Sequence, residues 1–271
     1  METTIIIGRD SNLSQHLRQE IDHCVLISSR DVVSNTKTLE HFKNNSINLI
    51  FNNFQPATQL GNLDNPQEYI QNSILCTAIV LNFFKNSAIN KIIYTSSSSV
   101  YGRSSDSFEG GTTNPLNLHS SLKLSNELLI TQFCKDNCID YTITRVFNMF
   151  GGYDNFSIIS KLIDSIREST TLKLINNGDS IRDFIHVNNV VEIYIKLLSV
   201  KNMPILNIGT GTGDSISLII QYFRDYCSID IKNTNQEELK ESVANNDLLL
   251  SIIDDTNFIS VRDYIKNKLD L

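Results

Sequence analysis

The sequence contains no apolar run that approaches the roughly 20 residues needed by a membrane-spanning helix. Its first residues, METTIIIG, lack the basic stretch and long apolar segment of a secretory signal. The five cysteines are scattered, and Cys134 and Cys138 have a helical i, i+4 spacing that is unlike a zinc or redox pair. We therefore expect a cytoplasmic protein with reduced thiols, no metal site and no membrane association.

Excess positive charge is also absent. The formal net charge is −7, so no global basic field would attract nucleic acid or anionic lipid. An anionic ligand must therefore be held by local donors. The 271 residues are enough for one large domain, or for a main domain with a small lobe.

Proline is scarce, and none of the four prolines interrupts an apolar run. The predicted buried strands are residues 4–7, 24–27, 47–51, 91–95, 141–147 and 205–209. The predicted helices lie near 12–22, 37–45, 68–87, 120–137 and 185–199. This alternation indicates an α/β fold with a parallel sheet covered by helices on both faces.

The pattern changes after Gly152. Apolar residues between Phe156 and Ile166 follow i, i+3, i+4 spacing, which predicts an amphipathic helix. Asp214 or Ser215 is suited to cap a further helix over the segment ISLIIQYF.

The segment with the clearest chemistry is KIIYTSSSSVYG, which begins at Lys91 and is followed by HSSLKLSNE from His119. An apolar run ends in four serines, Ser96 to Ser99, and Lys123 follows His119 by four positions, on one helix face. A serine at a strand end, facing a helix with a lysine, suits proton transfer beside a bound cofactor.

Together with R-x-F-N-x-x-G at 145–151 and R-D-F-I-H-V at 182–187, these motifs resemble the extended short-chain dehydrogenase/reductase family of NAD(P)-dependent nucleotide-sugar epimerases and dehydratases. The resemblance covers nearly the whole chain. It implies a Rossmann-type, doubly wound core of residues 1–150 plus about 185–213. It also implies a small substrate-binding lobe of about 151–184 and 214–271.

The same resemblance implies hydride transfer at a carbon of a nucleotide-linked sugar, as an epimerase or a 4-keto reductase, in surface polysaccharide or glycoconjugate synthesis. The short spacing between Arg30 and the strand at Ile47 is similar to that of the 4-keto-sugar reductases. Many relatives form homodimers through core helices, so we keep a homodimer as an expectation.

His119 stands where the family has a catalytic tyrosine. The resemblance implies that Ser97 binds the reacting oxygen, with Ser98 on the substrate side, and that Lys123 holds the nicotinamide ribose. Histidine can perform acid–base chemistry, although Lys123 disfavours the imidazolium, so His119 is better suited as a base. Three interpretations remain open: His119 replaces the tyrosine, it is a bystander while water or substrate moves the proton, or it marks the loss of the redox step.

The loop after the first strand has lost glycine. The family spacing is G-x-x-G-x-x-G, but only Gly8 remains, and Ser11 and Ser14 take the other two places. Serine is small and can donate to phosphate, and a helix N-terminus favours anions. Asp10 adds a negative charge. Either the loop still holds a cofactor, with contacts from Asn12 and Leu13, or it is an ordinary strand–turn–helix unit.

Arg30 follows Ser28 and Ser29 at the end of the second strand. An arginine there suits a 2′-phosphate, so Ser29 and Arg30 predict NADP(H), with NAD as the second choice. The alternative is that Arg30 is a solvated surface residue. By resemblance, the remaining predicted cofactor contacts are Asn53, Asn72 and Phe147, and Asn72 would also help to order the active-site helix.

For the substrate, the resemblance implies that Asn148 contacts the phosphate or sugar and that Arg182 contacts the diphosphate. Arg145 is expected to be structural, and NIGTGTG (207–213) to be a strand-to-helix turn. The stretch TNQEELKES (234–242) lacks a second phosphate-binding arginine. Because the glycine loop, the tyrosine and this stretch all depart from the family pattern, two alternatives stay open. One is a non-catalytic binding or regulatory protein, and the other is a non-redox enzyme that uses His119 as a base.

Overall fold

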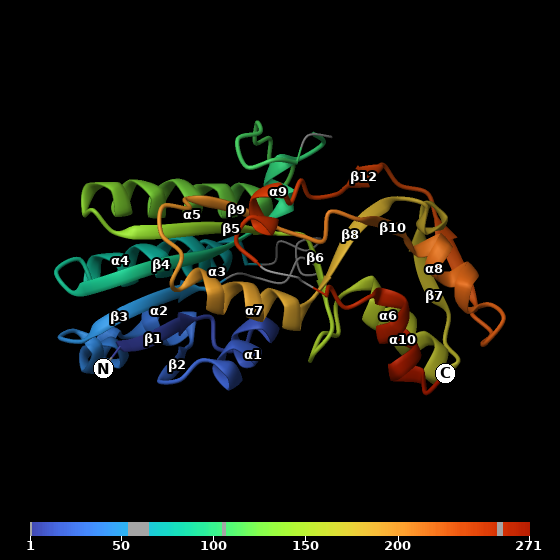
Figure 1. Cartoon of the computed structure of the whole chain (residues 1–271), viewed down its shortest axis with the longest axis horizontal. Coiled ribbons are helices and arrows are strands. Elements are labelled where there is room, and N and C mark those ends of the chain that lie inside the picture. Colours follow the sequence, from blue (N-terminus) through green and yellow to red (C-terminus); the bar gives the residue numbers. More distant parts are fainter. Residues whose placement is uncertain (1, 54–64, 105–106, 254–256) are drawn as a thin grey trace.

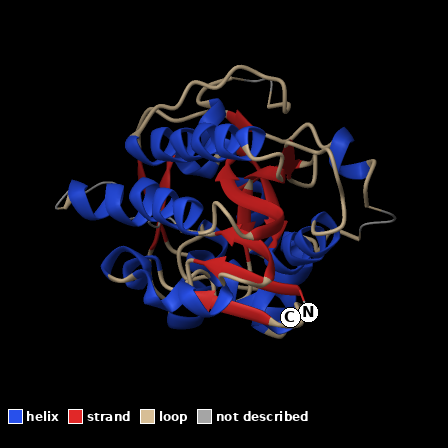
Figure 2. Ribbon diagram, turned by 90° about the vertical axis from the view of Figure 1, so that its left-hand side faces the viewer, coloured by secondary structure: helices blue, strands red, loops and turns tan. Residues whose placement is uncertain are grey.

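The computed structural model describes residues 2–53, 65–104, 107–253 and 257–271. Its main sheet has six strands in the order β2-β1-β3-β4-β5-β9, and every neighbouring pair is parallel (Figures 1 and 2). These strands are β1 (Glu2–Ile7), β2 (Cys24–Ile27), β3 (Ser46–Phe51), β4 (Ala88–Ser97), β5 (Asp140–Val146) and β9 (Ile205–Ile208). The predicted α/β fold with a parallel, doubly wound sheet is therefore confirmed.

Helices cover both faces of this sheet. On one face lie α2 (Ser29–Ser34), α4 (Cys76–Phe83) and α5 (Leu118–Asp136), and on the other lie α1 (Asn12–Glu20) and α7 (Val187–Leu197). The strands are nearly continuous apolar runs because both of their faces are buried. α9 (Asp247–Leu250) inserts Leu249 into the cluster formed by α1 and α7. This part of 214–271, a range predicted for the lobe, therefore packs on the core.

The smaller part of the molecule lies on the right of Figure 1. Its strands are β6 (Asn148–Phe150), β7 (Leu172–Ile175), β8 (Ile181–His186), β10 (Gly213–Ser215), β11 (Ile231–Thr234) and β12 (Glu241–Ser242), and its helices are α6 (Ile158–Glu168), α8 (Ile216–Phe223) and α10 (Val261–Leu269). A third apolar cluster joins the three helices to β7 and β8. Ser215 caps α8 by accepting a hydrogen bond from the Leu218 N–H at 3.3 Å, as expected for one of the two predicted caps.

Two predicted helices differ from those observed. The segment predicted as helix 37–45 is a 3₁₀ helix, Thr36–Phe42, preceded by the unpredicted α2. The segment 68–87 begins earlier, as α3 (Pro66–Ile70), because Pro66 occupies the first turn and Asn65 accepts from the Glu68 N–H at 3.1 Å. It then passes through a π-helical turn, Gln71–Leu75, before α4.

Short 3₁₀ turns at Ser98–Tyr101 and Asn176–Gly178 complete the elements. Within the described ranges, no helix combines the length and apolar character required to cross a membrane.

A buried ion pair joins β4 and β5 at the end of the sheet where these strands begin. The side chain of Lys91 is fully buried, and its Nζ lies 2.5 Å from Asp140 Oδ2 and 2.6 Å from the Val200 carbonyl. Burial lowers the pKa of Lys91, and the Asp140 carboxylate opposes that effect. Removing one member of such a pair leaves the other charge buried without compensation.

Asp140→Ala should therefore destabilise the fold by about 2–3 kcal/mol, measured as the free energy of unfolding in urea. The matched control is the double variant Lys91→Met/Asp140→Asn, which removes both charges and should recover much of that loss. Equal destabilisation of the single and double variants would contradict this role for the pair.

Candidate active site

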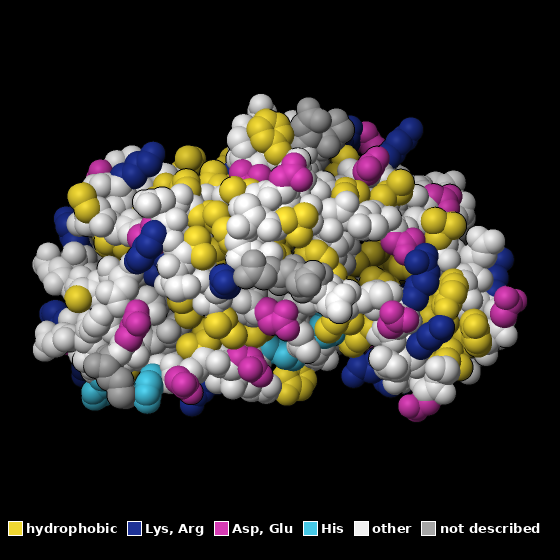
Figure 3. Space-filling model, viewed as in Figure 1, with side chains coloured by type: hydrophobic (Ala, Val, Ile, Leu, Met, Phe, Trp, Pro, Cys, Tyr) yellow, Lys and Arg dark blue, Asp and Glu magenta, His cyan; other side chains and the backbone are white. Residues whose placement is uncertain are grey.

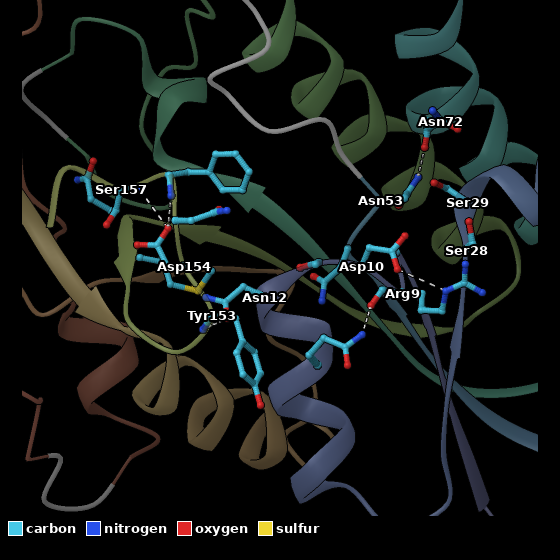
Figure 4. A pocket seen from close by; sticks show the side chains of 18 of the residues that line it. Arg9, Asp10, Asn12, Ser28, Ser29, Asn53, Asn72, Tyr153, Asp154 and Ser157 are labelled. Atoms are coloured by element: carbon cyan, nitrogen blue, oxygen red, sulfur yellow. Dashed lines mark hydrogen bonds and ion pairs between the residues drawn. The ribbon is translucent and has the colours of Figure 1, made fainter. Parts of the chain in front are cut away.

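A cavity of about 930 Å³ opens at the carboxyl ends of the parallel strands. Figure 4 shows it running from Ser28 and Ser29, past the start of α1, to the segment 153–158. Asn52 and Asn53 after β3, Asn148 and Met149 at the start of β6, and Phe184 on β8 also line it. In open α/β sheets, ligands bind in crevices outside the carboxyl ends of the strands.

Gly8 forms the base of this cavity. Its φ is +112°, and a Cβ at this position would lie 2.4 Å from the carbonyl oxygen of Asn52. Any other residue would strain the backbone and collide with the end of β3. The first glycine of the loop therefore retains its structural role.

The two serines that replace glycines differ in their placement. Ser11 is the N-cap of α1 and lines the cavity, and among the described residues its side chain makes no capping hydrogen bond. The side chain of Ser14 is fully buried and its Oγ accepts from Asn52 Nδ2 at 3.0 Å. Leu13 is likewise buried in the core. The side chains of Leu13 and Ser14 therefore do not line the cavity and cannot make the predicted cofactor contacts. Ser14 instead packs between α1 and the end of β3.

Asn12 joins the two sides of the cavity. Its Nδ2 donates to the Gly151 carbonyl, and its Oδ1 accepts from the Tyr153 N–H, both at 2.9 Å. The Tyr153 ring packs on His16 with a centroid distance of 5.0 Å. The side chain of Asn12 thus fixes the segment after β6 against the start of α1, a role that its place in the loop did not reveal.

Two arginines lie at the cavity wall near the end of β2. Arg30 pairs with Glu68 at 3.0 Å and has 71% of its side chain exposed. Arg9 pairs with Asp31 at 3.3 Å and with Asp10 at 3.4 Å, so the charge of Asp10 is partly offset. Sequence reasoning missed Arg9, although its position directly after Gly8 was a usable signal.

Asn53 also lines the cavity and is 1% exposed. Its Nδ2 donates to the carbonyls of Asn72 and Ser73, each at 3.0 Å, while its Oδ1 finds no hydrogen-bond partner in the described part of the chain. The expected ordering of α5 by Asn72 is not what the contacts show. Ser73 Oγ accepts from Asn126 of α5 at 2.9 Å, whereas Asn72 Nδ2 reaches Glu68 at 3.5 Å. The π-helical turn presents Ser73 to α5 in place of its neighbour.

The predicted catalytic residues lie at the end of β4 and the start of α5. Asn117 and Ser120 form a capping box that begins α5 one residue before His119. The Lys123 Nζ donates to the carbonyl of Thr95 on β4 at 2.5 Å. Ser97, two residues further along, is half-buried and its Oγ accepts from the Ser99 N–H at 3.2 Å. The chain thus brings the lysine helix against the serine strand.

A buried ion pair holds α5 in this position. Glu127, one turn beyond Lys123, lies 2.8 Å from Arg145 of β5 and also accepts from the Ser96 hydroxyl. The predicted structural role of Arg145 is in keeping with these contacts. Its guanidinium stacks on the ring of Tyr101, whose hydroxyl donates to Asn207 at 2.7 Å. Tyr101 is therefore part of the interior and does not supply the missing hydroxyl.

Burial changes the protonation of both His119 and Lys123. It lowers the pKa of His119 to about 4, and the charge of Lys123 acts in the same direction. It also lowers the pKa of Lys123 to about 7, with Glu127 opposing. At neutral pH the imidazole is therefore uncharged and can accept a proton, although the low pKa makes it a weak base.

The predicted substrate residues have different environments. Asn148 lines the cavity, and its Nδ2 donates to the Asp183 carbonyl at 3.0 Å. Phe147 is buried and packs with Tyr101 and Ala244, so its ring is not at the cavity wall. Arg182 pairs with Glu238 at 3.1 Å. Ser98 begins the 3₁₀ turn after β4 and is half-buried.

The glycine-rich turn at 207–213 is structural. Asp183 accepts from the backbone N–H groups of Thr210 and Gly211 at 2.8 and 2.9 Å, so these donors are already used. The turn leads through β10 into α8, close to the predicted strand-to-helix connection. His186 is packed edge-on against Phe150, as expected for a structural residue.

Sequence reasoning also missed the segment 153–158 as part of the cavity wall. Asp154 fixes its shape by accepting from the N–H groups of Phe156 and Ser157, at 2.9 and 3.0 Å.

On the face of the molecule seen in Figure 3, Lys and Arg side chains are interspersed with Asp and Glu side chains. In the described residues, no group of three or more His, Cys, Asp or Glu side chains is arranged to hold a metal ion.

The low pKa of His119 predicts a pH dependence of stability. Between its unfolded value near ~6.5 and its folded value of about 4, the unfolded state binds more protons, so stability falls as pH is lowered through this window. Relative to His119→Gln, the wild type should lose about 2 kcal/mol between pH 7 and pH 4.5. Urea unfolding of both proteins at these two pH values measures this difference. Equal losses of stability in the two proteins would contradict the low pKa of His119.

The comparison with protein families gives one clear match. Residues 2–209 match the model of the NAD dependent epimerase/dehydratase family. Among curated proteins, the chain is 27% identical over 213 residues to Protein CapI of Staphylococcus aureus, and 27% identical over 185 residues to UDP-glucuronate 4-epimerase of Thermodesulfobacterium geofontis. These matches cover 73% and 66% of this chain, but only 63% and 57% of the relatives.

Solved structures share the fold over nearly the whole chain. A mutant of UDP-glucuronic acid 4-epimerase from Bacillus cereus, in complex with UDP-4-deoxy-4-fluoro-glucuronic acid and NAD, has a TM-score of 0.87 at 20% identity and covers 100% of this chain and 98% of its own. UDP-N-acetylglucosamine 4-epimerase from Methanobrevibacter ruminantium M1, in complex with UDP-N-acetylmuramic acid, has a TM-score of 0.86 at 20% identity, with 99% and 98% covered. The family match and the parallel sheet agree with the motifs found in the sequence, and the chain belongs to the NAD dependent epimerase/dehydratase family.

Proposed function

We propose that this protein is an NADP(H)-dependent nucleotide-sugar epimerase or 4-keto reductase. The observation that carries the proposal is the contact of Lys123 with the Thr95 carbonyl, which sets α5 against the end of β4. The neighbouring strand, β3, is followed by Asn52 and Asn53, which line the large cavity. A proton-transfer group and a dinucleotide-sized cavity therefore share one edge of the sheet.

The residues present fit a nicotinamide dinucleotide. The cradle at Gly8 admits no Cβ, Ser11 leaves its hydroxyl outside the helix cap, and the N-terminus of α1 favours a pyrophosphate. Arg9 and Arg30 are the residues for a 2′-phosphate, with Ser29 beside them. When bound, the nicotinamide ring supplies the acceptor and donor of hydride. NAD is the alternative cofactor, because solved relatives contain it.

The substrate is proposed from the names of the relatives and from the second half of the cavity. The relatives include several UDP-sugar 4-epimerases, and solved neighbours hold UDP-sugars. Asn148 and the segment 153–158 line the part of the cavity away from Arg30, where a nucleotide sugar would lie. A role in surface polysaccharide synthesis follows only by analogy with such enzymes.

In the proposed chemistry, Ser97 hydrogen-bonds the reacting sugar oxygen and His119 moves its proton. The neutral imidazole accepts the proton when the C–OH group is oxidised. Because the pKa of His119 is about 4, the imidazolium then formed is a strong acid and readily returns the proton when the carbonyl is reduced. Lys123 holds the cofactor ribose from the same helix face.

A non-redox enzyme that uses His119 only as a base is the second candidate, because the imidazole is uncharged at neutral pH. The homodimer and the cytoplasmic location stay predictions from the sequence.

Arg30→Ala should weaken NADPH binding by about 10-fold while changing NADH binding little, because only NADPH carries the 2′-phosphate. Fluorescence titration of both cofactors measures this difference, and Arg9→Ala is the matched comparison at the second guanidinium. Equal weakening of NADPH and NADH binding by Arg30→Ala would show that Arg30 does not bind the 2′-phosphate.

His119→Ala should reduce turnover of UDP-glucose or UDP-glucuronic acid by about 100-fold or more, as expected for loss of a general base. The KM of the substrate and the affinity for cofactor should change little, since the side chain acts on the proton. His119→Tyr should retain or raise redox activity. Unchanged turnover in His119→Ala would exclude His119 from proton transfer.

A further inference from the structure

Arg182 lies on the strand that forms one wall of the cavity. It is two residues before Phe184 on β8, so both side chains project from the same face of the strand. Phe184 lines the cavity and pairs in the sheet with Asn148, which lines it as well. The guanidinium of Arg182 therefore lies on the same face of β8 as Phe184, next to the cavity, although Arg182 is not itself among the residues that line it.

This guanidinium already has an internal anion. Its Nη2 lies 3.1 Å from Glu238 Oε2, and its Nη1 donates to the Ile181 carbonyl at 2.8 Å. The side chains of Arg182 and Glu238 are only 20% and 23% exposed. A partly buried, hydrogen-bonded carboxylate competes with an incoming phosphate far better than a solvated one does.

Asn176 bonds to Glu238 and to the backbone close before it. Glu238 Oε1 accepts from Asn176 Nδ2 at 3.0 Å, and the same amide donates to the Gln236 carbonyl at 2.6 Å. Just beyond Glu238, the Lys240 carbonyl accepts from the Ile181 N–H at 2.8 Å and β12 pairs with β8. These contacts hold the segment that carries Glu238 against β8, beside Arg182.

We propose that Glu238 is an affinity-determining residue that competes with the substrate diphosphate for Arg182. The proposal rests on the proposed function and on the diphosphate contact that the family resemblance implies for Arg182. Its consequence is that the chain binds nucleoside diphosphates less tightly than its arginine alone would allow. The contact with Glu238 must be exchanged for a phosphate oxygen before the guanidinium can serve the ligand.

The test is calorimetric titration of the full chain with UDP and, separately, with uridine, which lacks the diphosphate. Glu238→Gln removes the charge but keeps an amide oxygen for Asn176. Glu237→Gln is the matched control, because Glu237 pairs with Arg103 at 2.7 Å and is 76% exposed. Thermal melting of each variant establishes that it is folded, and Glu238→Ala serves if the glutamine variant is not.

Glu238→Gln should bind UDP about 3- to 10-fold more tightly than the wild type, with uridine unchanged and Glu237→Gln within about twofold. The gain should disappear when Arg182→Gln is combined with Glu238→Gln. If the wild type binds UDP and Glu238→Gln binds it equally or less tightly, the competition is overturned while the proposed function stays intact. If no variant binds UDP but NADPH still binds, both the competition and the nucleotide-sugar substrate are wrong.

Discussion

The geometry of the site depends on one residue, Thr95, near the end of β4. Its carbonyl accepts from Lys123 at 2.5 Å, and its hydroxyl bonds to Asn52 and lies 2.7 Å from the hydroxyl of Tyr194. Asn52 in turn donates to Ser14 of α1. One buried network of hydrogen bonds therefore fixes α5, the end of β3, α1 and α7 relative to one another. In the water-free interior this arrangement of hydrogen bonds is strongly favoured, because any polar group left without a partner would carry the full cost of desolvation.

The same network explains how a loop that has lost two glycines keeps its shape. The glycine that cannot be replaced is Gly8, where the backbone of Asn52 comes within 2.4 Å of a Cβ position. At the third glycine position, a hydrogen bond through the hydroxyl of Ser14 links α1 to the end of β3. This bond takes the place of the close helix–strand packing that a glycine would allow. At the second position Ser11 simply faces the cavity. The departures from the motif are thus compatible with an intact cradle for phosphate.

Much of the fold was predictable because buried parallel strands are apolar runs of the right length, and all six strands of the main sheet were identified near their observed bounds. Among the strands of the smaller part, β6, β10 and β12 are only 3, 3 and 2 residues long, too short to give an apolar run. Motif spacing identified Ser97, His119 and Lys123 as candidates, but it could not show that the π-helical turn presents Ser73 instead of Asn72 to α5. Nor could it show that Glu238 reaches Arg182, because those residues are 56 positions apart and meet only through the lobe.

The proposed chemistry therefore requires the scaffold of the family, proton transfer by His119, and a cavity that accepts a dinucleotide. Titrating the purified wild-type protein with NADPH and NADH, followed by nicotinamide fluorescence, tests this most directly. The account predicts saturable binding of both, with NADPH the tighter. Absence of binding by either cofactor at millimolar concentration would contradict it, and would leave a member of the family whose cavity serves another ligand.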